Sequence, residues 1–416
     1  MVTYRSYYVL GIETSCDDTC ACLLDRRPDT AVDTSPGTVS VLATATRSAD
    51  NSEFRGIAPA QAVGHHQRNL SKVIQEVLDV SSRKMARPIK PDLICVTRGP
   101  GMRGSLSSGT ELAKGLALAW HVPLIGVHHM LGHLLTPRLP LPISLQVARF
   151  QGPRFPYLSL LTSGGHTMLV LSESLIKHTI IAKTIDNAIG DAIDKCTRIL
   201  GLPMYKNNSY GPSLEQAAEK YSQLPPLTAD EIQNDRIAAE GIKLTIPMRS
   251  KPGRPEGPDF SFASYEVMVA RGLAEFGDVE LSNRAILKIA SQIQNAFFTQ
   301  VIERVNFAIE TAIPDSIKPA LNDFVCSGGV ASNRALRSAL TTALGSTWNI
   351  HFPPLHLCTD NSEMIAWAGI ELWESYGLHS EIDMCAIPVW SIDGFTDASG
   401  WIQDLDAAKK MVGGQI

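Results

Sequence analysis

The stretch Gly126-Val-His-His-Met-Leu-Gly-His-Leu-Leu135 indicates most directly how the chain folds. The strand-like run Val122-Pro-Leu-Ile-Gly-Val127 leads into it, and open α/β sheets bind ligands at the carboxyl ends of their strands. His129 and His133 are four residues apart, so on a helix the two imidazoles lie on one face. The sequence therefore predicts an α/β sheet with a histidine pair where one of its strands ends.

Two interpretations of the histidine pair follow from the spacing. Two imidazoles on one helix face can hold one metal ion and leave coordination positions open for a substrate. Alternatively, both rings are structural and hydrogen-bonded inside the protein. Asp360 is the third candidate ligand, because His129, His133 and a carboxylate suit zinc or iron. The alternative for Asp360 is that it only caps the helix that begins near Glu363.

Length and composition restrict the class of protein. A chain of 416 residues should form about two to three domains. A hydrophobic content of 44% and a charged content of 19% are those of an ordinary globular protein. The net charge of −5 gives no overall nucleic-acid signature, so any RNA surface has to be local. No run approaches the ~18 apolar residues of a membrane span, and we expect no membrane contact.

The cysteines and the start of the chain bear on the compartment. Eight cysteines are scattered along the sequence without a C-x-x-C pair, which argues against a zinc ribbon and a thioredoxin motif. We expect reduced thiols of an intracellular compartment. The first strand should start by Tyr7, which leaves no room for a signal or transit peptide. The protein is therefore expected in the cytosol, unless the numbering begins near a processed end.

A strand–turn–strand pattern occurs twice. Residues 7–24 contain two β-rich runs around the polar turn 13–19, and residues 157–171 contain two more around the turn 162–166. Both turns are rich in Ser, Thr or Gly. This internal echo predicts a duplicated architecture.

Polar groups at these turns are candidates for binding and catalysis. Asp17 and Asp18 are suited to act as base or orienter, although adjacent acids are more often solvated surface. Ser163-Gly-Gly165 and Ser327-Gly-Gly329 each follow a strand, and such turns aim successive N–H groups at phosphate or carboxylate oxygens. Together they suggest a nucleotide-like ligand between two lobes. Asn333 either caps its helix or hydrogen-bonds the ligand.

The run Gly99-Pro-Gly-Met-Arg-Gly104 fits the G-x-G-x-x-G pattern between a strand and a helix. A dinucleotide fold also needs an acid about 20 residues further on, near the end of the next strand. That strand ends instead in Val127-His-His129, so we reject the dinucleotide interpretation. The remaining hypothesis is that the glycines let the backbone approach a ligand and that the helix start offers N–H groups to an anion.

Several motifs, in order from about residue 7 to residue 376, resemble the TsaD family of tRNA threonylcarbamoyladenosine synthesis. They are Val9-Leu-Gly-Ile-Glu-Thr-Ser-Cys-Asp-Asp18, Gly99-Pro-Gly-Met102, Gly126-Val-His-His129 with Gly132-His133, Leu161-Thr-Ser-Gly-Gly-His166, Ser327-Gly-Gly-Val330 with Asn333, and Cys358-Thr-Asp-Asn361. Residues 93–101 and 367–374 look most like the mitochondrial branch of fungi, which implies a mitochondrial protein.

The resemblance implies an α/β protein with the two-lobed actin-like ATPase fold of sugar kinases, heat-shock chaperones and actin, built from duplicated RNase H-like domains. We expect an N-terminal lobe of residues 1–126, to which residues 362–416 return. The C-terminal lobe would be residues 127–361, with the metal and adenylate site.

The resemblance also implies an enzyme, a tRNA N6-adenosine threonylcarbamoyltransferase. It would move threonylcarbamoyl from threonylcarbamoyl-adenylate to N6 of the adenosine 3′ of the anticodon, in tRNAs reading codons that begin with A. Its expected partners are tRNA, the adenylate and a second copy of the chain. By this resemblance one zinc or iron ion binds His129, His133 and Asp360, and Asp17 and Asp18 lie near the reaction centre. The adenylate contacts would be Leu161, Thr162, Ser163, Gly164, Gly165, Asp194, Gly211, Glu215 and Asn333.

The sequence departs from the family pattern in three places. Leu131 replaces the acid between the two histidines. Phe260-Ser-Phe-Ala-Ser-Tyr265 lacks the lysine that commonly follows in bacterial relatives, and Ser209-Tyr-Gly-Pro212 replaces a Gly-Gly-Pro segment, which leaves the substrate contacts of both segments in question.

Two rival functions remain to be weighed. A metalloprotease would need a general base, and the H-E-x-x-H glutamate is absent. A non-catalytic actin-like nucleotide-binding scaffold would bind nucleotide without transfer activity. For RNA contact, the local basic cluster of Lys243, Arg249, Lys251 and Arg254 is the candidate, and the alternative is a solvated loop.

Overall fold

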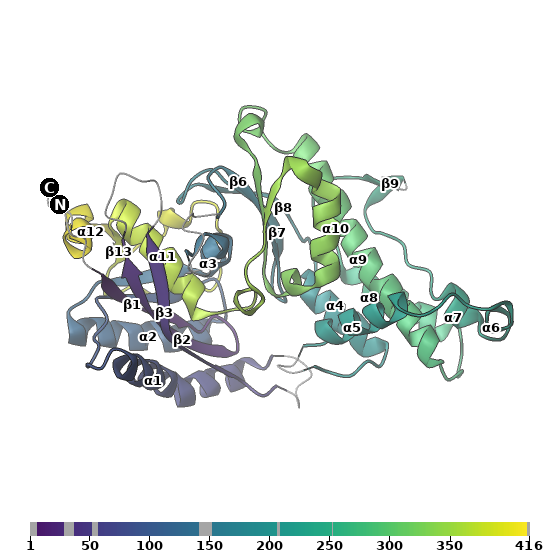
Figure 1. Ribbon diagram of the computed structural model, residues 1–416, viewed down its shortest axis with the longest axis horizontal. Helices are drawn as coiled ribbons and strands as arrows, with labels where there is room; N and C mark the ends of the chain where they lie inside the picture. The colour runs from purple at the N-terminus through teal and green to yellow at the C-terminus, as the bar shows by residue number, and fades with distance from the viewer. Residues whose placement is uncertain are drawn as a thin grey trace. The chain divides into compact units, whose positions relative to one another are not determined.

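The computed structural model describes residues 6–28, 37–51, 57–140, 152–205, 209–251 and 253–413 (Figure 1). Contacts divide the chain into two compact units. The first unit comprises Met1–Phe155, Ser172–Thr179 and Pro353–Ile416. The second comprises Pro156–Leu171 and Ile180–Phe352.

The first unit is built on a five-stranded sheet in the order β3-β2-β1-β4-β5. Its central strand β1 pairs antiparallel with β2 and parallel with β4, and β4 pairs parallel with β5. All seven residues of β1 are buried, as expected for an apolar strand covered on both faces. The strands are β1 (Tyr7–Glu13), β2 (Asp18–Arg27), β3 (Thr38–Ser48), β4 (Leu93–Gly99) and β5 (Leu124–His128).

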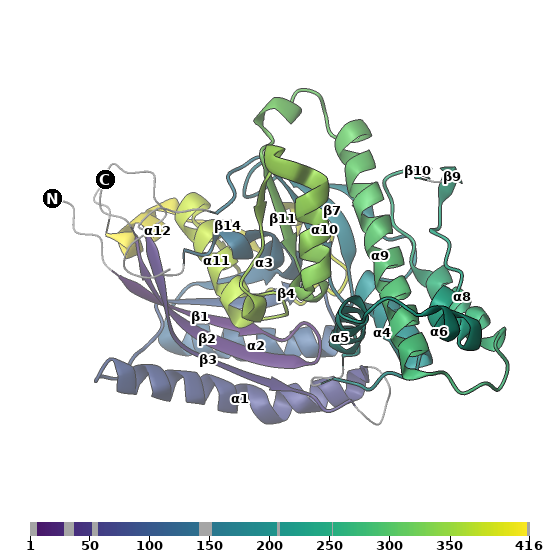
Figure 2. The same ribbon diagram turned by 45° about the vertical axis from the view of Figure 1, so that its right-hand side comes forward.

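Helices cover both faces of this sheet (Figure 2). The helices α1 (Pro59–Lys84) and α2 (Arg103–Trp120) lie on one face, and α11 (Ser362–Tyr376) lies on the other (Figure 1). The apolar residues of α1 recur at helical spacing, so one stripe of that helix faces the sheet. Its buried apolar residues include Leu70, Val73, Ile74 and Val77.

The short helix α3 (His129–Leu135) follows β5 without a loop. The C-terminal segment then adds a two-stranded sheet of β13 (Leu378–Ser380) and β14 (Trp401–Gln403), followed by α12 (Leu405–Val412). Ser380 Oγ accepts a hydrogen bond from the N–H of Gly126 at 2.9 Å. This contact fixes the C-terminal segment to β5.

The second sheet has the order β12-β11-β6-β7-β8. Read from its other edge, the strands follow the third-second-first-fourth-fifth order of the first sheet, and its first strand pairs parallel with its fourth. This repeated order confirms the predicted duplicated RNase H-like, actin-like α/β fold. The strands are β6 (Tyr157–Thr162), β7 (Thr167–Ser172), β8 (His178–Lys183), β11 (Asp323–Ser327) and β12 (Asn349–His351).

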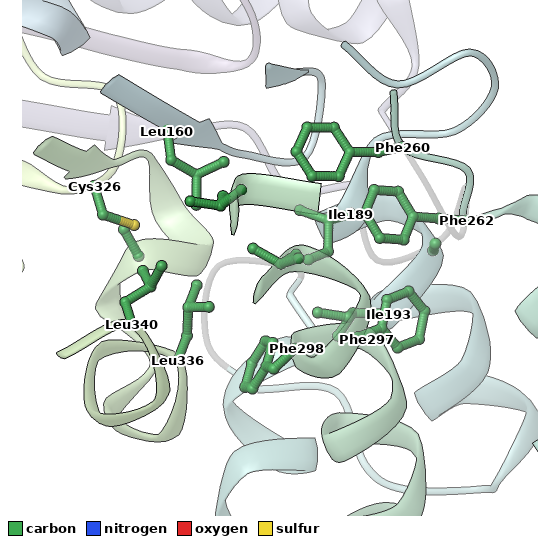
Figure 3. Packing of buried hydrophobic residues seen from close by; sticks show 14 of the residues in the cluster. Leu160, Ile189, Ile193, Phe260, Phe262, Phe297, Phe298, Cys326, Leu336 and Leu340 are labelled. Carbon is green, nitrogen blue, oxygen red and sulfur yellow. The ribbon is translucent and has the colours of Figure 1, made fainter. Parts of the chain in front are cut away.

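An apolar core joins the second sheet to its helices (Figure 3). Phe260, Phe262 and Phe297 stack there, with ring centroids 5.6–6.0 Å apart. The segment that lacks the family lysine is thus part of the core. The helices are α4 (Ile189–Ile199), α5 (Gly211–Ser222), α6 (Ala229–Asn234), α7 (Arg236–Glu240), α8 (Ala263–Ala274), α9 (Asn283–Thr311) and α10 (Arg334–Leu344), with a hairpin of β9 (Arg249–Lys251) and β10 (Arg254–Pro255).

The boundaries of the two units differ from those of the predicted lobes, residues 1–126 and 127–361. Because β5 pairs with β4 and α3 packs on α11, the segment after Gly126 belongs to the first unit. The chain returns to that unit at Pro353, before residue 362. The candidate metal ligands are therefore all in the first unit. Residues 141–151 lie outside the described residues, and none of the described helices could span a membrane.

Candidate functional site

The helix α3 presents both histidines. His129 is 6% exposed and His133 is 2% exposed, and their ring centroids lie 4.9 Å apart at nearly right angles. The helix approaches α11 closely at Gly132, where a Cβ atom would lie 3.0 Å from Met364 Cγ. Close packing of the two helices thus brings the start of α11 to the histidine pair.

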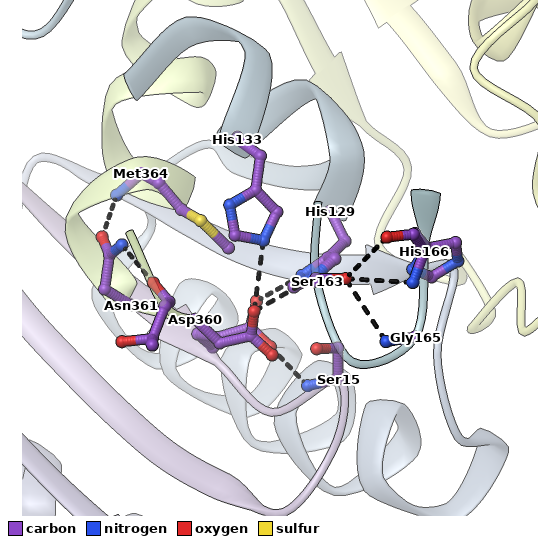
Figure 4. Close-up of polar contacts among 12 residues, drawn as sticks. Ser15, His129, His133, Ser163, Gly165, His166, Asp360, Asn361 and Met364 are labelled. Atoms are coloured by element: carbon purple, nitrogen blue, oxygen red, sulfur yellow. Dashed lines mark hydrogen bonds and ion pairs between the residues drawn. The ribbon is translucent and has the colours of Figure 1, made fainter. Parts of the chain in front are cut away.

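Asp360 lies two residues before Ser362, the first residue of α11, and is the third member of this candidate metal-binding group. Its Oδ1 atom lies 3.1 Å from His133 Nε2 and 3.4 Å from His129 Nε2 (Figure 4). The helix cap is the next residue, since Asn361 Oδ1 accepts the N–H of Met364 at 2.8 Å. The interpretation of Asp360 as only a cap is therefore wrong.

The donor set suits a divalent cation. One ligand atom from each of His129, His133 and Asp360 lies within 4.8 Å of the others, and two imidazoles with a carboxylate are typical of zinc and iron sites. The Asp360 side chain is 26% exposed while both histidines are buried, so one side of this metal-binding group is open to a substrate.

Charged neighbours shift the pKa values of the metal-binding group. Burial alone would lower the pKa of His129, but the carboxylates of Asp360 and Glu13 outweigh it and raise the pKa to about 10. Burial alone would raise the pKa of Asp360, but the imidazoles, His129 first, hold it well below its ordinary value. The group is therefore an arrangement of opposite charges.

The two acids of the turn between β1 and β2, Asp17 and Asp18, are half-buried. Asp17 accepts a hydrogen bond from Asn51 Nδ2 at 2.9 Å, and burial raises its pKa. Burial likewise raises the pKa of Asp18 to about 7, more than its hydrogen bond with Ser48 lowers it. Both side chains are half-buried, so neither is a fully solvated surface acid.

Sequence reasoning missed two residues of this turn region. Glu13, at the end of β1, contacts His129, and its position at a strand end beside Asp17 was the available signal. His66 of α1 lies with Nδ1 2.8 Å from Thr19 Oγ1 and Nε2 3.0 Å from the carbonyl of Cys16. Nothing in the spacing of α1 distinguishes His66 from an ordinary buried histidine.

Backbone of the protein itself packs against Gly99 and Gly101 of the glycine-rich run. A Cβ atom on Gly101 would lie 2.6 Å from the carbonyl oxygen of Ser15. The N–H groups of Gly101 and Met102 donate to the carbonyls of Pro388 and Ser15. These two N–H groups are thus occupied, and the anion-binding hypothesis is wrong for them.

In the second unit, the turn after β6 is held from within. Ser163 Oγ accepts the N–H of Gly165 at 3.3 Å and that of His166 at 3.0 Å (Figure 4). A Cβ atom on Gly164 or Gly165 would meet nothing within 4 Å. The turn is therefore shaped by Ser163 and leaves open space above its two glycines.

The remaining candidates of the second unit shape neighbouring backbone. Asp194 Oδ1 accepts the N–H of Gly211 at 2.9 Å, and burial raises the Asp194 pKa to about 6 despite such bonds. Glu215 Oε1 accepts the N–H of Arg334 at 2.8 Å. Asn333 caps α10, so the capping interpretation of that residue is confirmed.

Two further candidates stand at the end of β6, since Leu161 is buried there and Thr162 Oγ1 donates to the carbonyl of Ser327 at 3.3 Å. The neighbouring Gly328 has φ +94°, and a Cβ atom there would lie 2.4 Å from the Thr162 carbonyl. The second Gly-Gly turn therefore requires glycine at 328.

The basic cluster is only partly available to RNA. Arg249 forms an ion pair with Glu303 of α9. Lys251 and Arg254 face each other in the β9–β10 register, and both are exposed. Lys243 is exposed after α7. The RNA-contact hypothesis stays a prediction for these residues, with Arg249 already paired inside the protein.

The chain is similar to proteins of one family over most of its length. The family described as "TsaD: tRNA N6-adenosine threonylcarbamoyltransferase" matches residues 40–367. The chain is 33% identical over 409 residues to the mitochondrial tRNA N6-adenosine threonylcarbamoyltransferase of Schizosaccharomyces pombe, covering 96% of this chain and 90% of the relative. It is 35% identical over 395 residues to the Sphingopyxis alaskensis enzyme of that name, covering 94% and 97%.

Among solved structures, the crystal structure of T. kodakarensis HypF overlaps with 88% of this chain and 47% of its own, at 12% identity and a TM-score of 0.46. An overlap of this size adds nothing to the strand order described above.

Proposed function

The chain belongs to the TsaD family of tRNA N6-adenosine threonylcarbamoyltransferases, and we propose that its His129, His133 and Asp360 hold the metal that this transfer uses. The chain is accordingly a transferase that modifies tRNA. The observation that carries the proposal is the convergence of three side chains from distant parts of the sequence within 4.8 Å. A bound divalent cation would stabilise negative charge on a substrate oxygen or anchor the threonyl group.

The reaction needs one bond formed and one broken. The adenosine N6 attacks the carbonyl carbon of threonylcarbamoyl-adenylate, a C–N bond forms, and the C–O bond to the phosphate breaks as AMP leaves. N6 loses one proton in this step. We assign that proton to Asp18, assisted by Asp17, because a carboxylate with a pKa of about 7 accepts protons efficiently near neutral pH.

The adenylate is assigned to the second unit. Gly164 and Gly165 leave room for a ligand, and the N–H of Gly164 suits a phosphate oxygen, whereas that of Gly165 is donated to Ser163 Oγ. Asp194, Glu215 and Asn333 hold the segments around them through backbone hydrogen bonds. We propose that these residues, with Leu161, Thr162, Ser163 and Gly211, define the adenylate site by shaping its backbone.

The direct test is a transfer assay. Purified, zinc-loaded or iron-loaded protein is mixed with threonylcarbamoyl-adenylate and unmodified tRNA, and the modified nucleoside is measured after digestion. We expect stoichiometric AMP release and modification at the adenosine 3′ of the anticodon in tRNAs that read codons beginning with A. Absence of the nucleoside with folded, metal-loaded protein would contradict the proposal. Metal content by mass spectrometry distinguishes zinc from iron.

The family also suggests a cellular compartment and binding partners for this protein. The S. pombe relative is described as mitochondrial, and we propose the same compartment here, tested by imaging a C-terminally tagged chain. We also propose a homodimer, tested by sedimentation equilibrium. The exposed Lys251 and Arg254 are the proposed tRNA contacts, and replacing both with serine should reduce the salt dependence of tRNA binding.

The metalloprotease alternative lacks a base. Met130 stands where the glutamate of an H-E-x-x-H helix would be needed, and it is buried. The scaffold alternative would predict full function after His133→Ala, which the transfer assay also measures.

A further inference from the structure

Glu13 is a buried carboxylate at the end of β1, 1% exposed. Burying a carboxylate is costly unless its oxygens are hydrogen-bonded. Oε1 accepts the N–H of Ser15 at 2.5 Å, and Oε2 accepts the hydroxyl of Thr97. These two contacts, from the following turn and from β4, fix the orientation of the carboxylate.

The third partner of Glu13 is an imidazole. His129 Nδ1 lies 3.2 Å from Glu13 Oε2, while His129 Nε2 lies 3.4 Å from Asp360 Oδ1 on the other side of the ring. Among the ion pairs between described residues, Glu13 has this histidine and neither lysine nor arginine. The His129 ring is therefore held between two carboxylates.

This arrangement sets the tautomer of His129. The Nδ1 proton is donated to Glu13, so when a cation replaces the proton on Nε2, the Nε2 lone pair is the one that faces that cation on the side of Asp360. A histidine that ligates a metal almost always donates its other ring N–H to a carboxylate, carbonyl or water, which orients the ring and raises its basicity as a ligand. His129 satisfies this condition within the protein.

His133 is different. Its Nε2 also faces Asp360, at 3.1 Å, but its Nδ1 is buried without a hydrogen-bond partner among the described atoms. The two histidines of the metal-binding group are thus not equivalent, because only His129 has a carboxylate behind it.

We propose that Glu13 is a positioning residue for the metal-binding group: it holds the Nδ1 proton of His129 and keeps Nε2 directed at the cation. This inference rests on the proposed metal role of the group. It adds a residue outside the ligand set, from the first strand of the chain, whose loss weakens metal binding without removing a ligand.

The test measures Zn²⁺ affinity by competition with a chromogenic chelator, for the wild type and for Glu13→Gln. We expect Zn²⁺ to bind Glu13→Gln about 10–100-fold more weakly. The matched control is Glu374→Gln, another carboxylate of the first unit, which is bonded to Arg26 and Tyr7 at 2.7 Å. That control should lower the thermal stability and leave Zn²⁺ affinity within about twofold.

Equal Zn²⁺ affinity of wild type and Glu13→Gln would overturn the positioning role. A wild type that binds no Zn²⁺ would overturn the proposed metal role itself, so the two failures are distinguishable. A second measurement needs no variant at position 13. In wild-type protein loaded with ¹¹³Cd²⁺, NMR should show cadmium coupling to His129 Nε2 and a proton on Nδ1, whereas coupling to Nδ1 would overturn the proposal.

Discussion

The turn between β1 and β2 and the turn between β6 and β7 occupy the same place in two sheets of the same strand order. The first is acidic, with Glu13 buried and Asp17 and Asp18 half-buried. The second is neutral, with Gly164 and Gly165 exposed. A repeated topology thus supplies two similar strand ends, and the residues at each decide its chemistry. We expect proton and metal chemistry at the first turn and phosphate contacts at the second.

The largest expected effect tests the metal-binding group beside the first turn. His133→Ala should abolish Zn²⁺ binding and lower the rate of transfer about 1,000-fold, equivalent to about 4 kcal/mol in the barrier. The matched control is His178→Ala, which removes another buried imidazole of the first unit, bonded to Ser172 and the Leu175 carbonyl. That control should cost stability only. More than a tenth of wild-type activity in His133→Ala would contradict the assignment.

The next effect is a pH dependence confined to the first turn. The pKa of Asp18 is about 7 in the folded chain and about 3.9 unfolded. The folded state therefore binds the extra proton between about pH 4 and pH 7, and stability falls as pH rises through that window. In metal-free protein, Asp18→Asn should match the wild type at pH 4 and exceed it by about 4 kcal/mol at pH 8.

Urea unfolding at both pH values measures that difference. A constant stability difference between wild type and Asp18→Asn across the window would contradict the raised pKa. Asp17→Asn is a useful comparison, because burial raises the pKa of Asp17 as well.

A smaller effect separates glycines that the fold requires from glycines that leave room for a ligand. Gly328→Ala should destabilise the protein by about 2 kcal/mol, because φ is +94° and the Thr162 carbonyl occupies the Cβ position. Gly164→Ala meets no atom within 4 Å and should change stability by less than about 0.5 kcal/mol. If the turn binds the adenylate, Gly164→Ala should still raise the KM for it severalfold. Unchanged KM would argue against this turn as a substrate contact.

The smallest effects concern the two asparagine caps. Asn361→Ala and Asn333→Ala should each cost about 1 kcal/mol, since each loses an acceptor for backbone N–H groups. Aspartate at either position keeps the cap. Both asparagines also donate through Nδ2, Asn333 to Gln294 Oε1 at 3.0 Å and Asn361 to the carbonyls of Leu357 and Thr359 at 3.2 and 2.9 Å. Because aspartate loses two such bonds at position 361 and one at position 333, Asn361→Asp should recover less stability than Asn333→Asp. Thermal unfolding of the four variants checks this order, and equal recovery would contradict it.

The local elements and the repeated strand–turn–strand pattern were predictable from the amino-acid sequence alone. The two hairpins and the helical spacing of His129 and His133 depend on residues close in the chain, and the structure confirms them. The motifs of the family are equally local, so the family was recognisable before the fold was known.

Contacts between groups far apart in the chain were not predictable in this way and follow from the fold. Asp360 is 227 residues from His133. The sequence left open whether Asp360 is a ligand or a helix cap, and the packing of α11 on α3 brings it to the histidines. Glu13 is 116 residues from His129, and its place at a strand end did not indicate which group it contacts. The unit boundaries also depended on pairing between β4 and β5. These features follow from packing and strand pairing between segments far apart in the chain, which local periodicity does not encode.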